Sequence, residues 1–123
     1  MVIYVKKYNK DIGNYGEIIA KNFLIRHHYK ILCCNYRCPF GEIDIICLKD
    51  NIISFVEVKS RCYLKFGSPF DAITNSKKNR IRNVCRWYIA KNMIKNYNFR
   101  FDVISIIFLD DNTYHIKFLE NAF

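Results

Sequence analysis

Asp44 and Glu57 are the residues whose types and spacing point most directly to chemistry. Two carboxylates held together at the edge of a hydrophobic core need a cation between them, or one of them must take up a proton. Ligands that offer only oxygen suit Mg²⁺ or Mn²⁺ far better than zinc. The pair therefore predicts a divalent-metal site, provided that the fold brings the two carboxylates together.

A β-hairpin is the element that would bring them together. Its arms, Gly41–Lys49 and Ile52–Lys59, are rich in β-branched and aromatic residues, which favour strands. Asp50 and Asn51 between the arms both tolerate the positive φ angles of a two-residue turn. The pattern therefore predicts a tight hairpin with a fixed register.

The predicted register sets Asp44 directly opposite Glu57 and Glu42 opposite Lys59. Because strand side chains alternate with period two, all four residues are expected on one face. Directly opposed Cβ atoms lie about 4.5–5.5 Å apart, so the two carboxylates are close enough to share an ion. The alternative is a salt-bridged hairpin without catalytic ability, in which Lys59 neutralises Glu57 and Glu42.

The overall numbers predict a single domain over residues 1–123 with a real hydrophobic core. The chain has 123 residues, of which 51% are hydrophobic. No apolar run reaches the roughly 18–20 residues of a membrane span. Residues 1–13 are polar and basic and are expected to be a flexible lead-in, whose order of charged and apolar residues does not match a signal peptide. We therefore expect a cytoplasmic protein with no membrane partner.

The six cysteines favour free thiols in a reducing compartment, because none forms a Cys-x-x-Cys pair. Cys33, Cys34 and Cys38, with His27 and His28, contain the ligand types of a zinc site. Their spacing argues against one, since adjacent residues of a strand point to opposite faces.

The charge of the chain predicts a polyanionic partner. The formal net charge is +9, and no acidic residue occurs between Asp71 and Asp102. That interval is strongly basic and contains Lys77, Lys78, Arg80, Arg82, Arg86, Lys91, Lys95 and Arg100.

A first helix is predicted from about Tyr15 to His27 by its apolar periodicity. Asn14 is suited to the N-cap position, and Glu17 three residues later would complete a capping box. Glu17 can equally belong to a site, and the two roles are compatible because a first-turn carboxylate lies at the helix edge.

A second helix is predicted over roughly Asn75 to Asn96. Apolar residues recur at helical spacing and are expected to face the core, namely Ile81, Val84, Cys85 and Tyr88. Basic residues recur every four positions on another side, namely Lys78, Arg82 and Arg86. Like charges at this spacing repel, and bound phosphates would relieve the repulsion. A solvated basic face is the alternative.

The remaining strands complete an α/β fold. Strands are predicted at Tyr29–Arg37, Arg100–Leu109 and Thr113–Leu119, which gives the order α-β-β-β-α-β-β and a mixed five-stranded sheet flanked by helices. Arg100 and Asp102 share one side of their strand, which indicates a structural ion pair or an end-of-strand cap. The loop over residues 60–69 interleaves bases with aromatics, and it can either approach a phosphate backbone or pack Phe66 onto the core.

Asp44 followed by Glu57-Val58-Lys59 also matches the Asp…Glu-x-Lys signature of the PD-(D/E)XK nuclease superfamily. A longer set of motifs occurs in order along the chain, at Gly16–Ala20, Asn35–Arg37, Gly41–Asp44, Phe55–Arg61, Arg100–Val103 and Asn121–Phe123. With these motifs the sequence resembles the bacterial YraN-like family of small endonucleases, related to archaeal Holliday-junction resolvases. The resemblance covers about residues 13 to 123.

The resemblance implies a restriction-endonuclease-like α/β core and a Mg²⁺ or Mn²⁺ cofactor. By analogy Asp44, Glu57 and the Val58 carbonyl would bind the metal, Lys59 would steer or activate the attacking water, and Glu17 would complete the site. Phosphates of a DNA substrate would contact basic residues, namely Arg37, Arg61, Lys77, Lys78, Arg82 and Arg86. A homodimer is expected by analogy alone.

Three functions remain open from the sequence. The first is a Mg²⁺-dependent endonuclease that acts on DNA, with branched or damaged DNA as candidate substrates. The second is a nucleic-acid-binding module that retains the fold without catalysis. The third is a protein-interaction scaffold, which would bind DNA weakly and without a steep dependence on salt.

Overall fold

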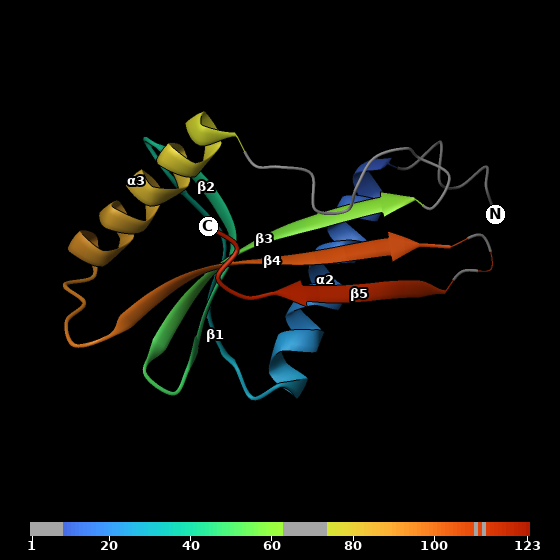
Figure 1. Ribbon diagram of the computed structural model, residues 1–123, viewed down its shortest axis with the longest axis horizontal. Helices are drawn as coiled ribbons and strands as arrows, with labels where there is room; N and C mark the ends of the chain where they lie inside the picture. Colours follow the sequence, from blue (N-terminus) through green and yellow to red (C-terminus); the bar gives the residue numbers. More distant parts are fainter. Residues whose placement is uncertain (1–8, 63–73, 110, 112) are drawn as a thin grey trace.

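The computed structural model describes residues 9–62, 74–109, 111 and 113–123, with the side chains of residues 9–12 left aside (Figure 1). Its elements, in chain order, are α2 (Asn9–Arg26), β1 (Lys30–Cys38), β2 (Gly41–Lys49), β3 (Ile52–Cys62), α3 (Asn75–Lys91), β4 (Asn98–Phe108) and β5 (Tyr114–Leu119). The predicted order of helices and strands is confirmed.

The five strands form one mixed sheet in the order β1-β2-β3-β4-β5. All neighbours are antiparallel except β3 and β4, which run parallel and are joined through α3. This crossover was expected, because two parallel neighbours cannot be joined by a tight turn. The predicted mixed five-stranded α/β sheet is therefore confirmed.

The two helices cover opposite faces of the sheet (Figure 1). Ile19, Ala20 and Leu24 of α2 pack in one buried cluster with Ile45 and other strand residues. A second buried cluster contains the inward side of α3, namely Ile81, Val84, Cys85 and Tyr88, together with Ile46, Ile53 and Phe55. The predicted inward face of α3 is thus confirmed, and alternate strand residues supply the two cores.

Both helix boundaries differ from the prediction at one end. α2 begins at Asn9, so Asn14 lies inside the helix and is not an N-cap, and residues 9–13 are helical rather than a flexible lead-in. The prediction gave Gly13 and Asn14 too much weight as helix breakers, although a glycine in a helix costs only about 1 kcal/mol and tertiary packing can offset it. α3 begins at Asn75 as predicted but ends at Lys91. Its predicted continuation to Asn96 is wrong because Asn92 caps the helix, and Met93 beyond it has a φ of 50°.

Three predicted features lie outside the described residues. They are residues 1–8 of the lead-in, the loop that carries Phe66, and the turn residues Asp110 and Asn112. Residues 60–62, predicted as the start of that loop, instead extend β3 to Cys62.

The cysteines and the helices add two further findings. All six cysteines are free thiols, and three of them, Cys47, Cys62 and Cys85, are buried. Neither of the helices in the described part of the chain has the length and apolar character needed to cross a bilayer.

Candidate active site

Asp44 lies where the ladder between β2 and β3 ends. The five pairs nearest the turn follow the predicted register and stop at Ile45 and Val56. The expected next pair, Asp44 opposite Glu57, is not part of this ladder. The Asp44 carboxylate instead accepts a hydrogen bond of 2.7 Å from the backbone N–H of Val58. A side chain therefore replaces a backbone carbonyl as the link between the strands at this point.

The other neighbour of Asp44 is also irregular. The register of β1 and β2 pairs Cys34 with Ile45 and Tyr36 with Ile43, and it passes over Asn35. Asn35 has a φ of 53°, a conformation that asparagine tolerates better than most residues. Asp44 is thus flanked by disturbed backbone on both sides, and this disturbance could not be read from alternation alone.

Asp44 and Glu57 nevertheless line one pocket together with residues of α3. Ile46 and Phe55, two residues away on the same strands, pack in the cluster under α3, and so does Ile43 next to Asp44. A pocket of about 310 Å³ between β2, β3 and α3 is lined by both carboxylates and by Glu42. The fold therefore gathers three acids around one cavity.

Burial is the main reason why the pKa of Asp44 is raised to about 7. The Val58 N–H opposes the shift by stabilising the charged form. Three acidic groups reinforce it by repulsion, namely Glu57, Glu17 and Glu42. A carboxylate in these surroundings gains free energy from either a proton or a nearby cation.

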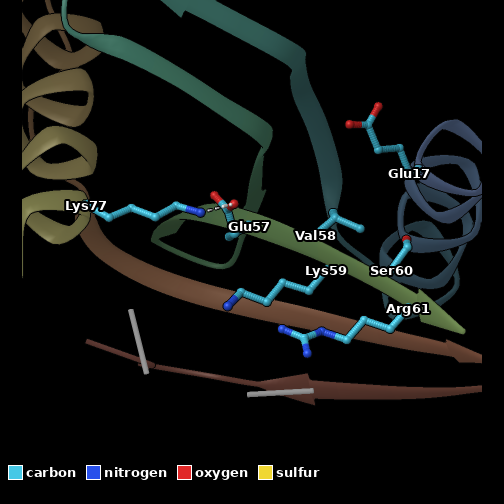
Figure 2. Close-up of a pocket in the computed structure, with 8 residues that line it drawn as sticks. Glu17, Glu57, Val58, Lys59, Ser60, Arg61 and Lys77 are labelled. Atoms are coloured by element: carbon cyan, nitrogen blue, oxygen red, sulfur yellow. Dashed lines mark hydrogen bonds and ion pairs between the residues drawn. The ribbon is translucent and has the colours of Figure 1, made fainter. Parts of the chain in front are cut away.

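A second opening, of about 380 Å³, lies on the other side of Glu57 and extends to α2 (Figure 2). Glu17 reaches it from α2, and Lys59 and Arg61 extend together from one side of β3. Glu57 and Lys77 line both openings. The structure thus brings Glu17 of α2 to the same opening as Glu57 and Lys59 of β3.

Lys77 has a position that the sequence did not predict. Its Nζ lies 2.9 Å from Oε1 of Glu57, whose side chain is only 17% exposed (Figure 2). The sequence assigned Lys77 to phosphate contacts along α3. The signal that was missed is its place in the first turn of the helix, where the Thr74 side chain caps its backbone N–H at 3.1 Å.

The other basic residues predicted to contact nucleic acid are spread more widely. Arg82 and Arg86 donate to Asn79 and Asn83, three residues earlier on α3, at 3.4 and 3.1 Å. Arg37 pairs with Glu42 at 3.2 Å on an exposed surface. Glu42 was expected to face Lys59, and Arg37 on β1 is a partner that this expectation did not include. Exposed pairs of this kind contribute little to stability and exchange readily for a phosphate. Arg61 lines the opening beside Lys59, and Lys78 is half-buried on α3.

The donor set fits a hard divalent cation. Within the described ranges, no three His, Cys, Asp or Glu side chains converge on a point that could hold a metal ion, and this includes the cysteines and histidines considered for zinc. Mg²⁺ needs fewer protein ligands, because it keeps several waters and is held by one or two carboxylates. Asp44 and Glu57, which line one pocket, meet that need.

Comparison with known proteins identifies the family. Residues 16–106 match the model of the Uncharacterised protein family UPF0102. The chain belongs to this family. A UPF0102 protein of Clostridium perfringens is 48% identical over 120 residues, covering 97% of this chain and 98% of the relative. One of Clostridium acetobutylicum is 47% identical over 116 residues, covering 94% and 95%. These names state the family and no activity.

The segment that matches the UPF0102 model begins at Gly16, and the structure gives this residue a physical role. A Cβ at Gly16 would overlap Oγ of Ser60 on β3 and lie 3.0 Å from its Cβ. Only glycine therefore lets α2 lie this close to the strand. The close contact brings the next residue, Glu17, to the opening beside Glu57.

This UPF0102 chain also contains a carboxylate, Asp102, whose surroundings stabilise its charge, unlike those of Asp44. Asp102 is fully buried and accepts hydrogen bonds from the Ser54 hydroxyl, from Arg100 Nε at 2.8 and 2.9 Å, and from the Asn121 backbone N–H at 2.8 Å. Arg100 in turn donates to the Tyr29 hydroxyl at 2.7 Å. The predicted ion pair between Arg100 and Asp102 is confirmed, and its network joins β4 to the C-terminus.

Proposed function

We propose that this protein is a Mg²⁺-dependent endonuclease that hydrolyses phosphodiester bonds in DNA. The observation that carries the proposal is the setting of Asp44, which is partly buried, close to three acids, and placed beside Glu57 in one pocket. A fold gains no stability from such a group, because repulsion and burial both oppose its charge. A binding role for a cation accounts for the arrangement.

In this proposal Asp44 and Glu57 hold the metal, with the Val58 carbonyl as a third ligand. Bound Mg²⁺ would lower the pKa of a coordinated water and neutralise charge on the scissile phosphate. Glu17 supports the set from α2. The Val58 N–H fixes the Asp44 carboxylate, so the ligand does not have to be ordered when the metal binds.

Lys59 and Arg61 supply the positive charge of the site. Both line the same opening as Glu57, and they extend in the same direction from β3. Lys59 orients the attacking water by hydrogen bonding and stabilises the negative charge that grows on the phosphate oxygens. Arg61 binds the neighbouring phosphate.

DNA binding is assigned to the basic face of α3 and to Arg37. Lys78, Arg82 and Arg86 recur every four residues on a helix that has no acidic residue in its first turn. Their contacts would be to phosphates, which position a duplex without reading its sequence. Lys77 joins them only when it leaves Glu57.

The sequence resemblance to YraN-like proteins and to Holliday-junction resolvases supports the same chemistry, and it suggests branched or damaged DNA as the substrate. The order of the elements and the mixed sheet agree with a restriction-endonuclease-like core.

The test is cleavage of supercoiled and branched DNA in the presence of Mg²⁺ or Mn²⁺. Asp44→Ala and Glu57→Ala are expected to reduce nicking by about a hundredfold or more while DNA binding survives. Asp111→Ala, which removes an exposed carboxylate from the turn after β4, is the matched control and should cleave like the wild type.

A second candidate is a nucleic-acid-binding module without catalysis. The observation in its favour is the ion pair between Lys77 and Glu57, which neutralises one carboxylate without a metal. If wild type and both alanine variants bind DNA equally and none of them cleaves it with any divalent metal, the binding module replaces the endonuclease.

A further inference from the structure

An exposed aromatic pair lies at the turn between β1 and β2. Phe40 occupies this two-residue turn and is 47% exposed. Its ring meets the ring of Trp87 on α3 edge to face, with centroids 5.8 Å apart and planes at 63°. Trp87 is half-buried, and so it is held by the helix while one part of it stays accessible. We refer to these two residues as the Phe40–Trp87 pair.

The Phe40–Trp87 pair lies next to the 310 Å³ pocket that Asp44 and Glu57 line. Gly41 follows Phe40 directly and lines that pocket together with Val84, which lies one helical turn before Trp87. The two lining residues lie close together, because a Cβ added at Gly41 would be 3.5 Å from Val84 Cγ2. A DNA strand bound at Asp44 could therefore continue directly onto the Phe40–Trp87 pair.

The charges around the Phe40–Trp87 pair are mostly positive. Lys91 Nζ lies over the Trp87 ring, 5.7 Å from its centroid. Arg80 lines the same pocket as Gly41. Arg37 lies three residues before Phe40, and the carboxylate near it, Glu42, is already paired with it. The patch thus combines aromatic faces with cations, which is the composition of surfaces that bind single-stranded nucleic acid.

We propose that the Phe40–Trp87 pair binds unpaired bases of a DNA strand. The inference deepens the endonuclease proposal, because it makes the substrate a DNA in which bases next to the cleaved bond are single-stranded. A base stacks on the exposed face of Phe40, and a second base takes the place of the Lys91 ammonium on Trp87. The ammonium then binds an adjacent phosphate.

Two observations favour a nucleic-acid strand over an apolar peptide or a second copy of the chain. The side chain that lies over the Trp87 ring is a cation, Lys91, rather than an aliphatic residue. The rings also meet edge to face rather than stacked, a contact that covers a face of one ring at most. A flat base fits such a surface through its own π-face, and the cations offset the charge of its phosphate.

The test uses the fluorescence of Trp87, which is the single tryptophan of the chain. Oligothymidylate and a blunt duplex of equal length are titrated into the full chain in EDTA, so that no cleavage can occur. Oligothymidylate is expected to quench the emission to saturation. The duplex should leave the emission nearly unchanged even where the anisotropy of labelled DNA reports binding.

Variants of Phe40 then separate stacking from other contacts. Phe40→Ala is expected to weaken oligothymidylate binding about tenfold, and Phe40→Leu almost as much, because leucine keeps apolar volume but has no aromatic face. Tyr114→Ala removes an aromatic residue of similar exposure from β5, at the opposite edge of the sheet, and should bind like the wild type. Thermal unfolding confirms that each variant is folded.

Each outcome decides between the possibilities. Binding of oligothymidylate without quenching, or with equal affinity in Phe40→Ala, overturns the proposal. Normal binding in Phe40→Leu with a loss in Phe40→Ala indicates an apolar partner instead, and a dimer that Phe40→Ala dissolves indicates contact between copies. If quenching occurs as expected but no DNA is cleaved with Mg²⁺, the base-binding site stands and the endonuclease proposal fails. If duplex DNA is cleaved but oligothymidylate does not quench the emission, the endonuclease proposal stands and the base-binding site fails.

Discussion

Asp102 and Asp44 are two carboxylates of one sheet, one fully and one partly buried, with opposite surroundings. Asp102 lies on β4, is fully buried, and receives hydrogen bonds from a guanidinium, a hydroxyl and a backbone N–H. Asp44 lies on β2, receives one hydrogen bond from Val58, and is surrounded by other acids. The more deeply buried group is therefore the better compensated one.

Under the proposed function, the difference separates a structural charge, Asp102, from a metal-binding one, Asp44. Taking a charge out of water costs several kcal/mol, and a fold retains such a group when its own dipoles and counter-charges offset the cost. The surroundings of Asp102 meet this condition within the chain. The surroundings of Asp44 leave room for a cation from solution. Substitutions of the two carboxylates should therefore change the stability of the protein in opposite directions.

The largest expected effect is the loss of stability in Asp102→Asn. The substitution removes the buried counter-charge of Arg100, whose side chain is 17% exposed. Removing one partner of a buried pair costs about 3–5 kcal/mol, measured as the free energy of unfolding in urea. Glu120→Gln removes the exposed and more distant partner of Arg100, at 3.5 Å, and should cost less than about 1 kcal/mol. Equal effects of the two substitutions would mean that the network around Asp102 is not structural.

Gly16→Ala is expected to have the next largest effect, because the added methyl group meets Ser60. Such overpacking costs about 1–3 kcal/mol. The matched control is Gly13→Ala in the same helix, where nothing lies within 4 Å of the added Cβ. This control should be stabilised by about 0.5–1 kcal/mol through helix propensity. Opposite shifts in melting temperature would show that α2 is held against β3 at this contact.

Asp44→Asn is expected to stabilise the protein, in contrast to Asp102→Asn. The folded pKa of Asp44, about 7, lies above the ordinary value of 3.8, so the folded state binds more protons between these pH values. Wild-type stability therefore falls as the pH rises from about 4 through about 7, and the variant lacks this fall. Above that range the variant should gain about 1–2 kcal/mol, since water still screens a partly exposed carboxylate. A variant that is less stable than the wild type at pH 8 would contradict the account.

Alternation and turn chemistry predicted most of the fold. The hairpin of β2 and β3 and the inward side of α3 follow local rules that a sequence displays directly. For the candidate site, the structure shows that Asp44 and Glu57 line one pocket, and their role there stays a prediction. The departures arise from tertiary contacts. The left-handed Asn35 beside Asp44, the hydrogen bond from Val58 and the contact of Gly16 with Ser60 depend on how separate elements pack, which no local pattern records.

Lys77 shows the same limit for charges. It was predicted to contact a phosphate, and only the crossing of α3 over β3 brings its ammonium to Glu57. If the Lys77 ammonium competes with a metal ion for the Glu57 carboxylate, removing it should strengthen metal binding. Lys77→Met should then tighten Mn²⁺ binding about two- to fivefold, which corresponds to the usual strength of such an ion pair. Arg86→Met, on the exposed side of the same helix, is the control and should leave it unchanged. Weaker binding in Lys77→Met would mean that Lys77 holds Glu57 in place for the metal.

The central claim is that Asp44 is a ligand for a divalent cation, and calorimetric titration of Mn²⁺ into the metal-free protein near pH 7 tests it most directly. We expect wild type to bind with release of a proton, seen as a heat that depends on the ionisation enthalpy of the buffer, because the raised pKa leaves Asp44 partly protonated there. Asp44→Asn should lose the binding. Equal binding in Asp44→Asn, or no binding by the wild type, would contradict the account.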